Sequence, residues 1–310
     1  MSFIQSVSTI VIAILLESLP YVLLGVLISA VLQTMVSDSL LQRWMPKRTL
    51  PGILFGCLLG LVFPLCECGI IPVVHRLIRK GMPPYIGLVF IMAGPIINPI
   101  VFISTFQAFR SQPEMAFSRI ALAFVVSAII GWIASRRVQI NSLRQLTEQP
   151  DQHASRSQHA KSPFPKNKQA VYWKAKLHDM LEHAAIEMFD VGKFIVLGAL
   201  ATALLQTAVS KDWLLTVSSG SWTPHLFMMG LSYVLSICST ADAFVGVTFL
   251  PNFSMGSVLA FLVFGAMFDI KSTFMLLKVF RFKTVAMVLL LSFVIVLVGS
   301  VGFDWLNTYF

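Results

Sequence analysis

Pro64-Leu-Cys-Glu-Cys-Gly69 interrupts a strongly apolar sequence, and Cys238-Ser-Thr-Ala-Asp242 does so again later in the chain. The apolar runs around both stretches exceed the ~20 residues that cross a bilayer. Polar groups and helix breaks at that depth are costly in lipid, so they usually line a binding site or a path. Two such interruptions therefore predict a membrane protein with a transport role.

Composition supports a membrane protein. Hydrophobic residues make up 56% of the 310 residues and charged residues 12%, which excludes an ordinary soluble domain. The first apolar stretch runs to about Val36, with no Lys or Arg before it and no small-residue cleavage site. It is therefore expected to be the first membrane span and not a removable signal peptide. We predict an all-α polytopic protein in contact with membrane lipid.

The formal net charge of +9 comes from basic residues beside the hydrophobic segments and from one central polar stretch. The positive-inside rule accounts for this placement in a membrane protein. We therefore expect no nucleic-acid partner. All four cysteines lie in apolar segments, which disfavours an extracellular disulfide framework.

The chain divides into two related halves. Residues 139–178 are polar, charged and contain several prolines, so they predict a flexible cytoplasmic linker between membrane repeats 1–138 and 179–310. The motif Leu-Gln-Thr-x-Val-Ser begins at Leu32 and occurs again 173 residues later, and Cys66 is matched by a cysteine 172 residues later. The persistent order and spacing indicate an internal duplication.

Each repeat contains four apolar segments, and the second is long for one crossing and short for two. The segments span 7–36, 50–80, 84–109 and 116–135, and then 183–208, 214–249, 256–279 and 284–303. If the second segment returns to the face it entered, as a re-entrant hairpin or a tight helix pair, only Arg110, Arg119 and Lys211 lie opposite the linker. The positive-inside rule thus favours an inverted repeat, with both termini outside and the broken segments meeting near the midplane.

The cysteines of the two interruptions are candidate metal ligands. Cys66 and Cys68 cannot share a helix face but can converge from an irregular turn, and Cys238 could supply a third sulfur. Thiolates select soft ions such as zinc, copper(I) or trivalent arsenic. Alternatively, these are packing cysteines in a crowded helix break. Cys57 has no counterpart in the motif and is expected in the core.

The first interruption also predicts a helix boundary. Pro64 and Gly69 should end one helix, and a new helix is expected to begin near Ile71. Its N-terminus would present free N–H groups to a bound anion or to Glu67.

Carboxylates inside the interruptions are candidate functional groups. Glu67 and Asp242 would be expensive in ionised form at this depth unless paired, hydrated or protonated. We expect them to bind a cation or to couple transport to protons. Ser239 and Thr240 stand at the positions that match Glu67 and Cys68, so they complete the candidate substrate site.

Three further residues are predicted to contact substrate. Asn98 lies in Gly94-Pro-Ile-Ile-Asn-Pro99, and its counterpart in the second repeat is Asp269, with Lys271 close by. Because proline lacks an N–H donor, Asn98 either satisfies freed carbonyls or faces the path. Glu17 in the first span has no local partner of opposite charge, so it is a candidate lining residue.

The quoted motifs resemble the predicted-permease family that includes the YraQ and YcgR proteins and the ArsP organoarsenical exporters. The resemblance rests on residues 64–73, 93–99 and 238–244 and extends over nearly the whole length. It implies a multi-pass permease of the bacterial plasma (inner) membrane. The Cys-Glu-Cys form is similar to the YcgR branch, which implies a second membrane subunit and an association with metal homeostasis. Many relatives have Ser or Thr in place of Glu67, so an organoarsenical substrate does not follow.

The leading function is a secondary permease for a small solute, such as a soft metal or metalloid species, because the sequence has no nucleotide-binding phosphate loop. We expect neither an enzyme nor a cofactor. One alternative is a membrane thiol-disulfide oxidoreductase that cycles Cys66 and Cys68, although a Cys-x-Cys ring is small and strained. The other is a noncatalytic subunit of a two-component permease complex, docked through the linker.

Overall fold

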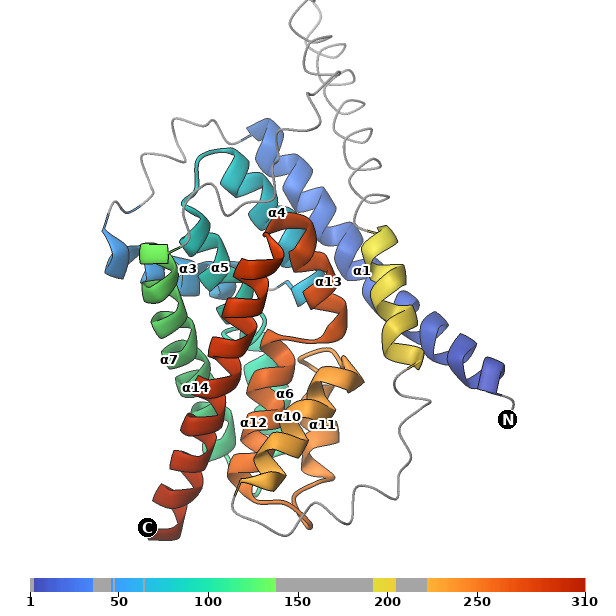
Figure 1. The fold of residues 1–310 in the computed structure, drawn as a ribbon, viewed down its shortest axis with the longest axis vertical. Coiled ribbons are helices and arrows are strands. Elements are labelled where there is room, and N and C mark those ends of the chain that lie inside the picture. The colour runs from blue at the N-terminus through green and yellow to red at the C-terminus, as the bar shows by residue number, and fades with distance from the viewer. Residues whose placement is uncertain are drawn as a thin grey trace, which may run out of the picture.

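The computed structural model describes residues 3–35, 46, 48–63, 65–137, 192–204 and 222–309. Every regular element in these ranges is a helix, so the predicted all-α class is confirmed (Figure 1). The predicted linker, 139–178, lies outside the described residues.

The helices before the linker are α1 (Phe3–Met35), α3 (Thr49–Val62), α4 (Glu67–Arg79), α5 (Pro84–Ala93), α6 (Pro99–Ala108) and α7 (Glu114–Arg137). After it come a helix over Gly192–Leu204, and then α10 (Thr223–Leu235), α11 (Asp242–Val247), α12 (Met255–Met267), α13 (Ile270–Val279) and α14 (Phe282–Tyr309).

Four helical stretches of the described chain are long and apolar enough to cross a membrane. They are Val7–Gly25, Glu114–Arg137, Met255–Val279 and Phe282–Asn307. The remaining apolar helices of the described chain have 10–17 residues, and breaks end α3 and α5. A polytopic membrane protein built partly from broken helices therefore fits the described chain.

The first interruption separates α3 from α4, as predicted, but the new helix begins earlier than expected. It starts at Glu67 and not near Ile71, because the extended backbone ends at the N-cap residue, Cys66. Pro72 lies inside α4 and tolerates the helical backbone, at the loss of one i→i−4 hydrogen bond to the Cys68 carbonyl. Glu67 and Cys68 are therefore the first two residues of a helix.

The third segment of each repeat is also a pair of helices. Gly94 and the residues up to Asn98 separate α5 from α6, and Phe268 and Asp269 separate α12 from α13. Asn98 and Asp269 are both helix N-caps, and each side chain accepts a backbone N–H of its own helix. Short polar side chains are the preferred residues at this position.

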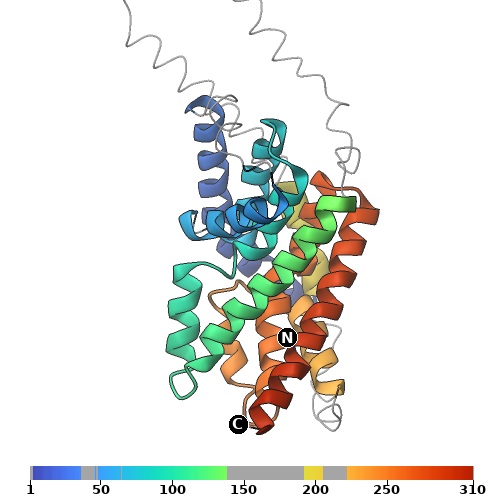
Figure 2. The same cartoon turned by 90° about the vertical axis from the view of Figure 1, so that its left-hand side faces the viewer.

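The short helices pack in a reciprocal pattern. In the upper part of Figure 1, α4 packs against α13, and in the lower part α11 packs against α6. The longer α7 and α14 lie against each other, and both contact α12. In Figures 1 and 2 the two chain termini lie toward the lower end, whereas the C-terminal ends of α4, α7 and α13 lie toward the upper end.

Glycines allow the first helix of each half to approach the broken segments closely. A Cβ at Gly25 would lie 2.5 Å from the carbonyl oxygen of Gly69 in α4. A Cβ at Gly198, in the second half, would lie 2.9 Å from the Cα of Lys271 in α13. These backbones are in direct contact, so α1 and the helix over 192–204 brace the starts of α4 and α13.

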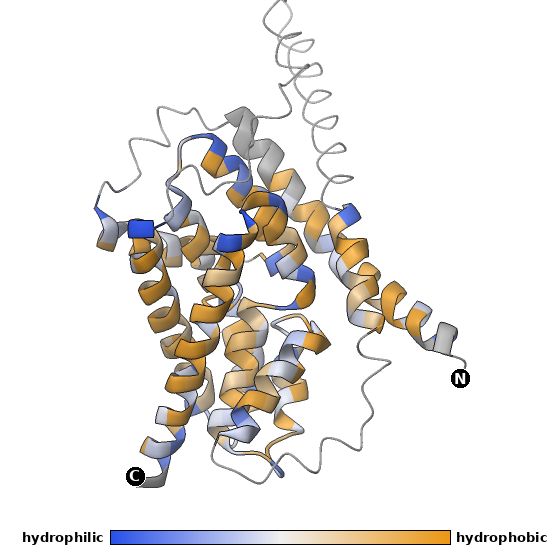
Figure 3. Ribbon diagram, in the orientation of Figure 1, coloured by the Kyte–Doolittle hydropathy of each residue, from blue (hydrophilic) through white to orange (hydrophobic). Residues whose placement is uncertain are grey.

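Hydrophobic residues make up most of the helices (Figure 3), and many of them are exposed. Leu50 on α3 is 77% exposed, and Leu290 and Val298 on α14 are 66% and 61% exposed. A soluble monomer rarely exposes continuous apolar surface on this scale. These faces suit contact with lipid tails, while the polar groups lie among the broken helices.

Candidate functional site

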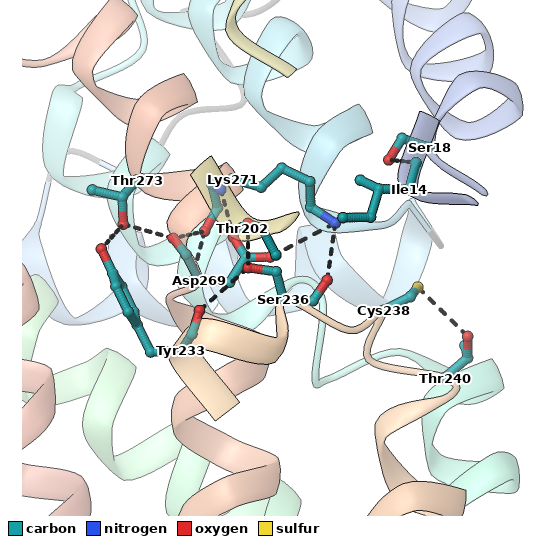
Figure 4. A network of polar contacts seen from close by, with 11 residues as sticks. Ile14, Ser18, Thr202, Tyr233, Ser236, Cys238, Thr240, Asp269, Lys271 and Thr273 are labelled. Atoms are coloured by element: carbon teal, nitrogen blue, oxygen red, sulfur yellow. Dashed lines mark hydrogen bonds and ion pairs between the residues drawn. The ribbon is translucent and has the colours of Figure 1, made fainter. Parts of the chain in front are cut away.

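Lys271, in the first turn of α13, is the centre of the site and is only 5% exposed. Its ammonium Nζ lies 3.7 Å from Asp269 Oδ2 and donates a hydrogen bond to the Ser236 carbonyl at 3.4 Å (Figure 4). Ser236 ends α10 with a left-handed backbone, φ 48°, which is uncommon for a residue other than glycine. The lysine thus reaches from α13 to the stretch that leads to Cys238.

Asp269 has both a structural and an electrostatic role. Its Oδ1 accepts the Ser272 backbone N–H, and the Ser272 hydroxyl accepts the Asp269 N–H at 3.0 Å, which completes a capping box. Its Oδ2 faces Lys271. The Tyr233 hydroxyl donates to Thr273, and the Thr273 hydroxyl donates to the Asp269 carbonyl (Figure 4). The carboxylate is therefore held firmly in place beside the ammonium.

The start of α4 supplies the other side of the site. Glu67 and Cys68 are buried, with exposed fractions of 6% and 3%. Because α4 packs against α13, the helix start that carries Glu67 and Cys68 in the first half meets the helix that carries Lys271 beside Asp269 in the second.

Glu67 has an unused hydrogen-bonding atom. Its Oε1 is buried and has no hydrogen-bond partner among the described residues. A buried polar atom without a partner costs roughly 1–3 kcal/mol, so such atoms in a protein interior commonly mark a ligand, a water or a functional role. The site therefore has an acceptor oxygen available to a ligand.

The predicted sulfur ligands are only partly assembled. Cys66 is the N-cap residue of α4 and Cys68 lies in its first turn, and Cys238 Sγ accepts from Thr240 Oγ1 at 3.6 Å. All four cysteines are free, and Cys57 is buried in a separate apolar cluster, as predicted. In the described chain, no three His, Cys, Asp or Glu side chains are arranged to hold a metal ion. The three-sulfur metal site stays a prediction.

Asp242 does not face Lys271 but forms a second buried ion pair. Arg119 Nη2 lies 2.6 Å from Asp242 Oδ2, and the two side chains are 1% and 5% exposed. Arg119 also donates to Thr105 Oγ1 at 2.8 Å and to the carbonyls of Ser239 and Leu262. The guanidinium of α7 thus joins the first half to the start of α11.

This pair corrects one sequence inference, because Arg119 was counted among the charges outside the membrane core. It is buried instead, and its Nη2 donates to the carboxylate and to two carbonyls of the second half. A signal was present in the sequence, because Arg119 lies within a largely apolar stretch. The pairing itself depends on the tertiary fold. Lys271 and Ser236 were likewise not predicted as site residues.

The other predicted residues have different placements. Asn98 caps α6, because its Oδ1 accepts the Ile100 N–H at 2.9 Å. Ser239 is buried and contributes its carbonyl to Arg119. Glu17 lies on α1, but its side chain is outside the described part of the structure.

The geometry describes a buried polar site between two sets of broken apolar helices, and comparison with known proteins agrees with it. The family described as predicted permease matches residues 3–304. The chain belongs to this predicted-permease family. It is therefore a membrane transporter, as the resemblance of its motifs implied.

Two curated relatives cover most of the chain. The protein named UPF0718 protein YcgR, from Bacillus subtilis, is 42% identical over 299 residues, which are 96% of this chain and 97% of the relative. A Streptococcus mutans protein named as a two-component membrane permease complex subunit is 34% identical over 274 residues, 88% of this chain and 87% of the relative. No solved structure matches the chain.

Proposed function

We propose that this chain is a multi-pass permease of the bacterial inner membrane that moves a soft metal or metalloid cation by a secondary mechanism. The observation that carries the proposal is the meeting of Glu67 and Cys68 on α4 with Asp269 and Lys271 on α13. Sulfur ligands favour soft cations, and carboxylates can neutralise their charge. Buried ionisable groups at the ends of short membrane helices are typical of transport sites.

The halves, residues 1–138 and 179–310, form an inverted repeat in this proposal. Reciprocal packing supports it: α4 lies on α13 and α11 on α6, and these helices come from matching segments of the two halves. If each helix is replaced by its counterpart in the other half, the upper pair of Figure 1, α4 and α13, becomes the lower pair, α11 and α6. Rocking of one half against the other would then open the site to each side of the membrane in turn.

The distribution of basic residues supports the proposed sidedness. The last turns of α4, α7 and α13 carry Arg76 and Arg79, Arg136 and Arg137, and Lys278. All three helix ends point toward the upper end of Figure 1, away from the chain termini. By the positive-inside rule this upper end faces the cytoplasm, together with the linker, and the termini lie outside.

In this mechanism the thiols of Cys66, Cys68 and Cys238 contact the cation, and Glu67 supplies a carboxylate oxygen. Asp242 acts indirectly, because it is held by Arg119 and positions the segment that carries Cys238. Four remaining residues are proposed to line the path beside this centre: Glu17, Asn98, Ser239 and Thr240.

A transport experiment tests the proposal. Cells that express the protein, or its Cys66→Ser, Cys68→Ser or Cys238→Ser variants, are exposed to zinc, cadmium or arsenite, and the cell content of each element is measured by mass spectrometry. Cys57→Ser is the matched control, since Cys57 lies in a separate apolar cluster. We expect the wild type and the control to change accumulation equally and the three site variants to lose the effect. Equal accumulation in all variants and in cells without the protein would refute a soft-cation substrate.

A two-component assembly is a second candidate, supported by the name of the Streptococcus mutans relative. In that case this chain contains the polar site, and a second membrane subunit completes the path. Purification of the tagged protein from its native membrane should then recover one partner in a fixed ratio, and deletion of that partner should abolish flux. Full flux by the chain alone in liposomes would exclude this alternative.

A further inference from the structure

The described chain buries two cations, Lys271 and Arg119, and they are held in different ways. Arg119 makes short contacts, 2.6 Å to Asp242 and 2.8 Å to Thr105. The Lys271 contacts are longer, 3.7 Å to Asp269 and 3.4 Å to the Ser236 carbonyl, at or beyond the limit of an ordinary hydrogen bond. Arg119 is locked in place, whereas Lys271 is held mainly by the charge of its surroundings.

Those surroundings are the groups that a soft cation would need. Glu67 and Cys68 lie at the start of α4, which packs against α13, and the Ser236 carbonyl that Lys271 contacts lies two residues before Cys238. A lysine head is a compact point charge with three donors and no acceptor, on a flexible four-carbon stem. It therefore occupies the position of a cation without being able to leave the protein.

We propose that Lys271 is a tethered cation: it neutralises the substrate site when the site is empty and is displaced by the incoming soft cation. This inference rests on the proposed function and identifies the residue that competes with the substrate. With the ammonium in place, Glu67 and Asp269 have a counter-charge. When substrate binds, its positive charge takes over that role and the lysine head moves aside.

The proposal gives the empty carrier a way to return. An unpaired buried carboxylate is costly in a membrane interior, so a site that is anionic when empty would resist any step that encloses it. An intramolecular ammonium removes that obstacle without a second ion.

An alternative use of a buried lysine is to bind an anionic substrate directly. The two roles predict opposite effects of removing the charge. If Lys271 competes with a cation, the Lys271→Met variant should bind the cation more tightly. If Lys271 contacts an anion, the affinity of the variant for cations should not exceed that of the wild type.

The test uses the full-length protein in lipid nanodiscs with Cd²⁺ as the probe, measured by calorimetry and by the ultraviolet charge-transfer absorbance of cadmium thiolates. We expect Lys271→Met to bind Cd²⁺ at least about tenfold more tightly, equivalent to ~1.4 kcal/mol. Lys271→Arg keeps the charge and should bind like the wild type. In liposomes Lys271→Met should transport more slowly in spite of its higher affinity. Lys283→Met, at an exposed lysine, is the matched control and should change nothing.

A second comparison covers the case in which Lys271→Met does not fold. Glu67→Gln lowers the negative charge of the site. Comparing the Cd²⁺ affinity of Glu67→Gln with that of Glu67→Gln/Lys271→Met therefore measures the effect of Lys271 in a protein with one carboxylate fewer. The double variant should bind Cd²⁺ more tightly than the single one. Equal or weaker binding after loss of Lys271 in a folded background would overturn the proposal.

The outcomes also separate this inference from the proposed function. If the wild type shows no cadmium-thiolate absorbance, and Cys68→Ser does not differ from it, the soft-cation function fails. If the wild type binds Cd²⁺ through its thiols and removal of Lys271 leaves the affinity unchanged, only the tethered-cation role fails.

Discussion

Replacing Arg119 by methionine removes the cation that joins α7 to the start of α11. The side chain is 1% exposed and donates to Thr105, Asp242 and the carbonyls of Ser239 and Leu262. Methionine fills much of the same space, so the main loss is electrostatic. Asp242 would remain buried without a counter-charge, and its Oδ1 already has no hydrogen-bond partner in the described chain.

The expected cost follows from this uncompensated charge. Removal of one partner from a buried ion pair destabilises a protein by roughly 3–5 kcal/mol. At roughly 2 °C per kcal/mol for a chain of this size, the melting temperature should fall by about 6–10 °C. Thermal unfolding of the purified protein, followed by tryptophan fluorescence, measures the change. Arg110→Met is the control, because Arg110 is exposed at the end of α6 and should shift the melting temperature by less than 2 °C, or ~1 kcal/mol.

A double variant separates the pair from other effects. Arg119→Met/Asp242→Asn removes both charges, so it should be more stable than the sum of the two single changes predicts, by about 1–3 kcal/mol. The reasoning is refuted if the free-energy changes of the two single variants add up to that of the double variant. It is also refuted if Arg119→Met has the same melting temperature as the Arg110→Met control.

Two more predictions concern the contacts that position the site. Gly25→Val places a side chain against the carbonyl of Gly69 and should destabilise the protein by about 1–3 kcal/mol in thermal unfolding. Gly230→Ala, at a glycine with open space around it, should leave stability nearly unchanged, and equal effects would contradict the close contact. Asp269→Asn keeps an N-cap oxygen but loses the charge beside Lys271, so it should lose Cd²⁺ affinity in calorimetry. Asp269→Ala loses the cap as well as the charge, so it should be less stable than Asp269→Asn by ~1 kcal/mol, and identical melting of both variants would contradict the capping role.

Sequence patterns predicted the helices and the interruptions because these depend on local chemistry. Proline and glycine mark breaks wherever they occur in an apolar run, and the breaks after α3 and α5 follow them. The start of α4 was misplaced because Gly69 was expected to belong to the break, whereas it lies inside the helix together with Pro72. The structure accommodates Pro72 one turn into the helix, where a single hydrogen bond is lost.

The partners of the buried charged residues could not be predicted from local patterns, because they are far apart in sequence. Asp242 was recognised as a costly carboxylate, but nothing local points to Arg119, more than a hundred residues earlier. Lys271 was noticed only as a neighbour of Asp269. Its relation to Glu67 depends on the packing of α4 against α13, and a repeat at equal spacing does not reveal which helices touch.

The two buried cations also have a consequence for biogenesis. Arg119 of the first half meets its carboxylate in the second, and Lys271 of the second half interacts with Glu67 of the first. Each half is therefore synthesised with an ionised group whose ion-pair partner lies in the other half. That group can be buried as an ion pair only after the other half has folded against it. Either half produced alone should be a target for membrane quality control, and co-synthesis of the two fragments should restore both. The two parts of the chain therefore depend on each other, because each buries charged groups whose partners lie in the other.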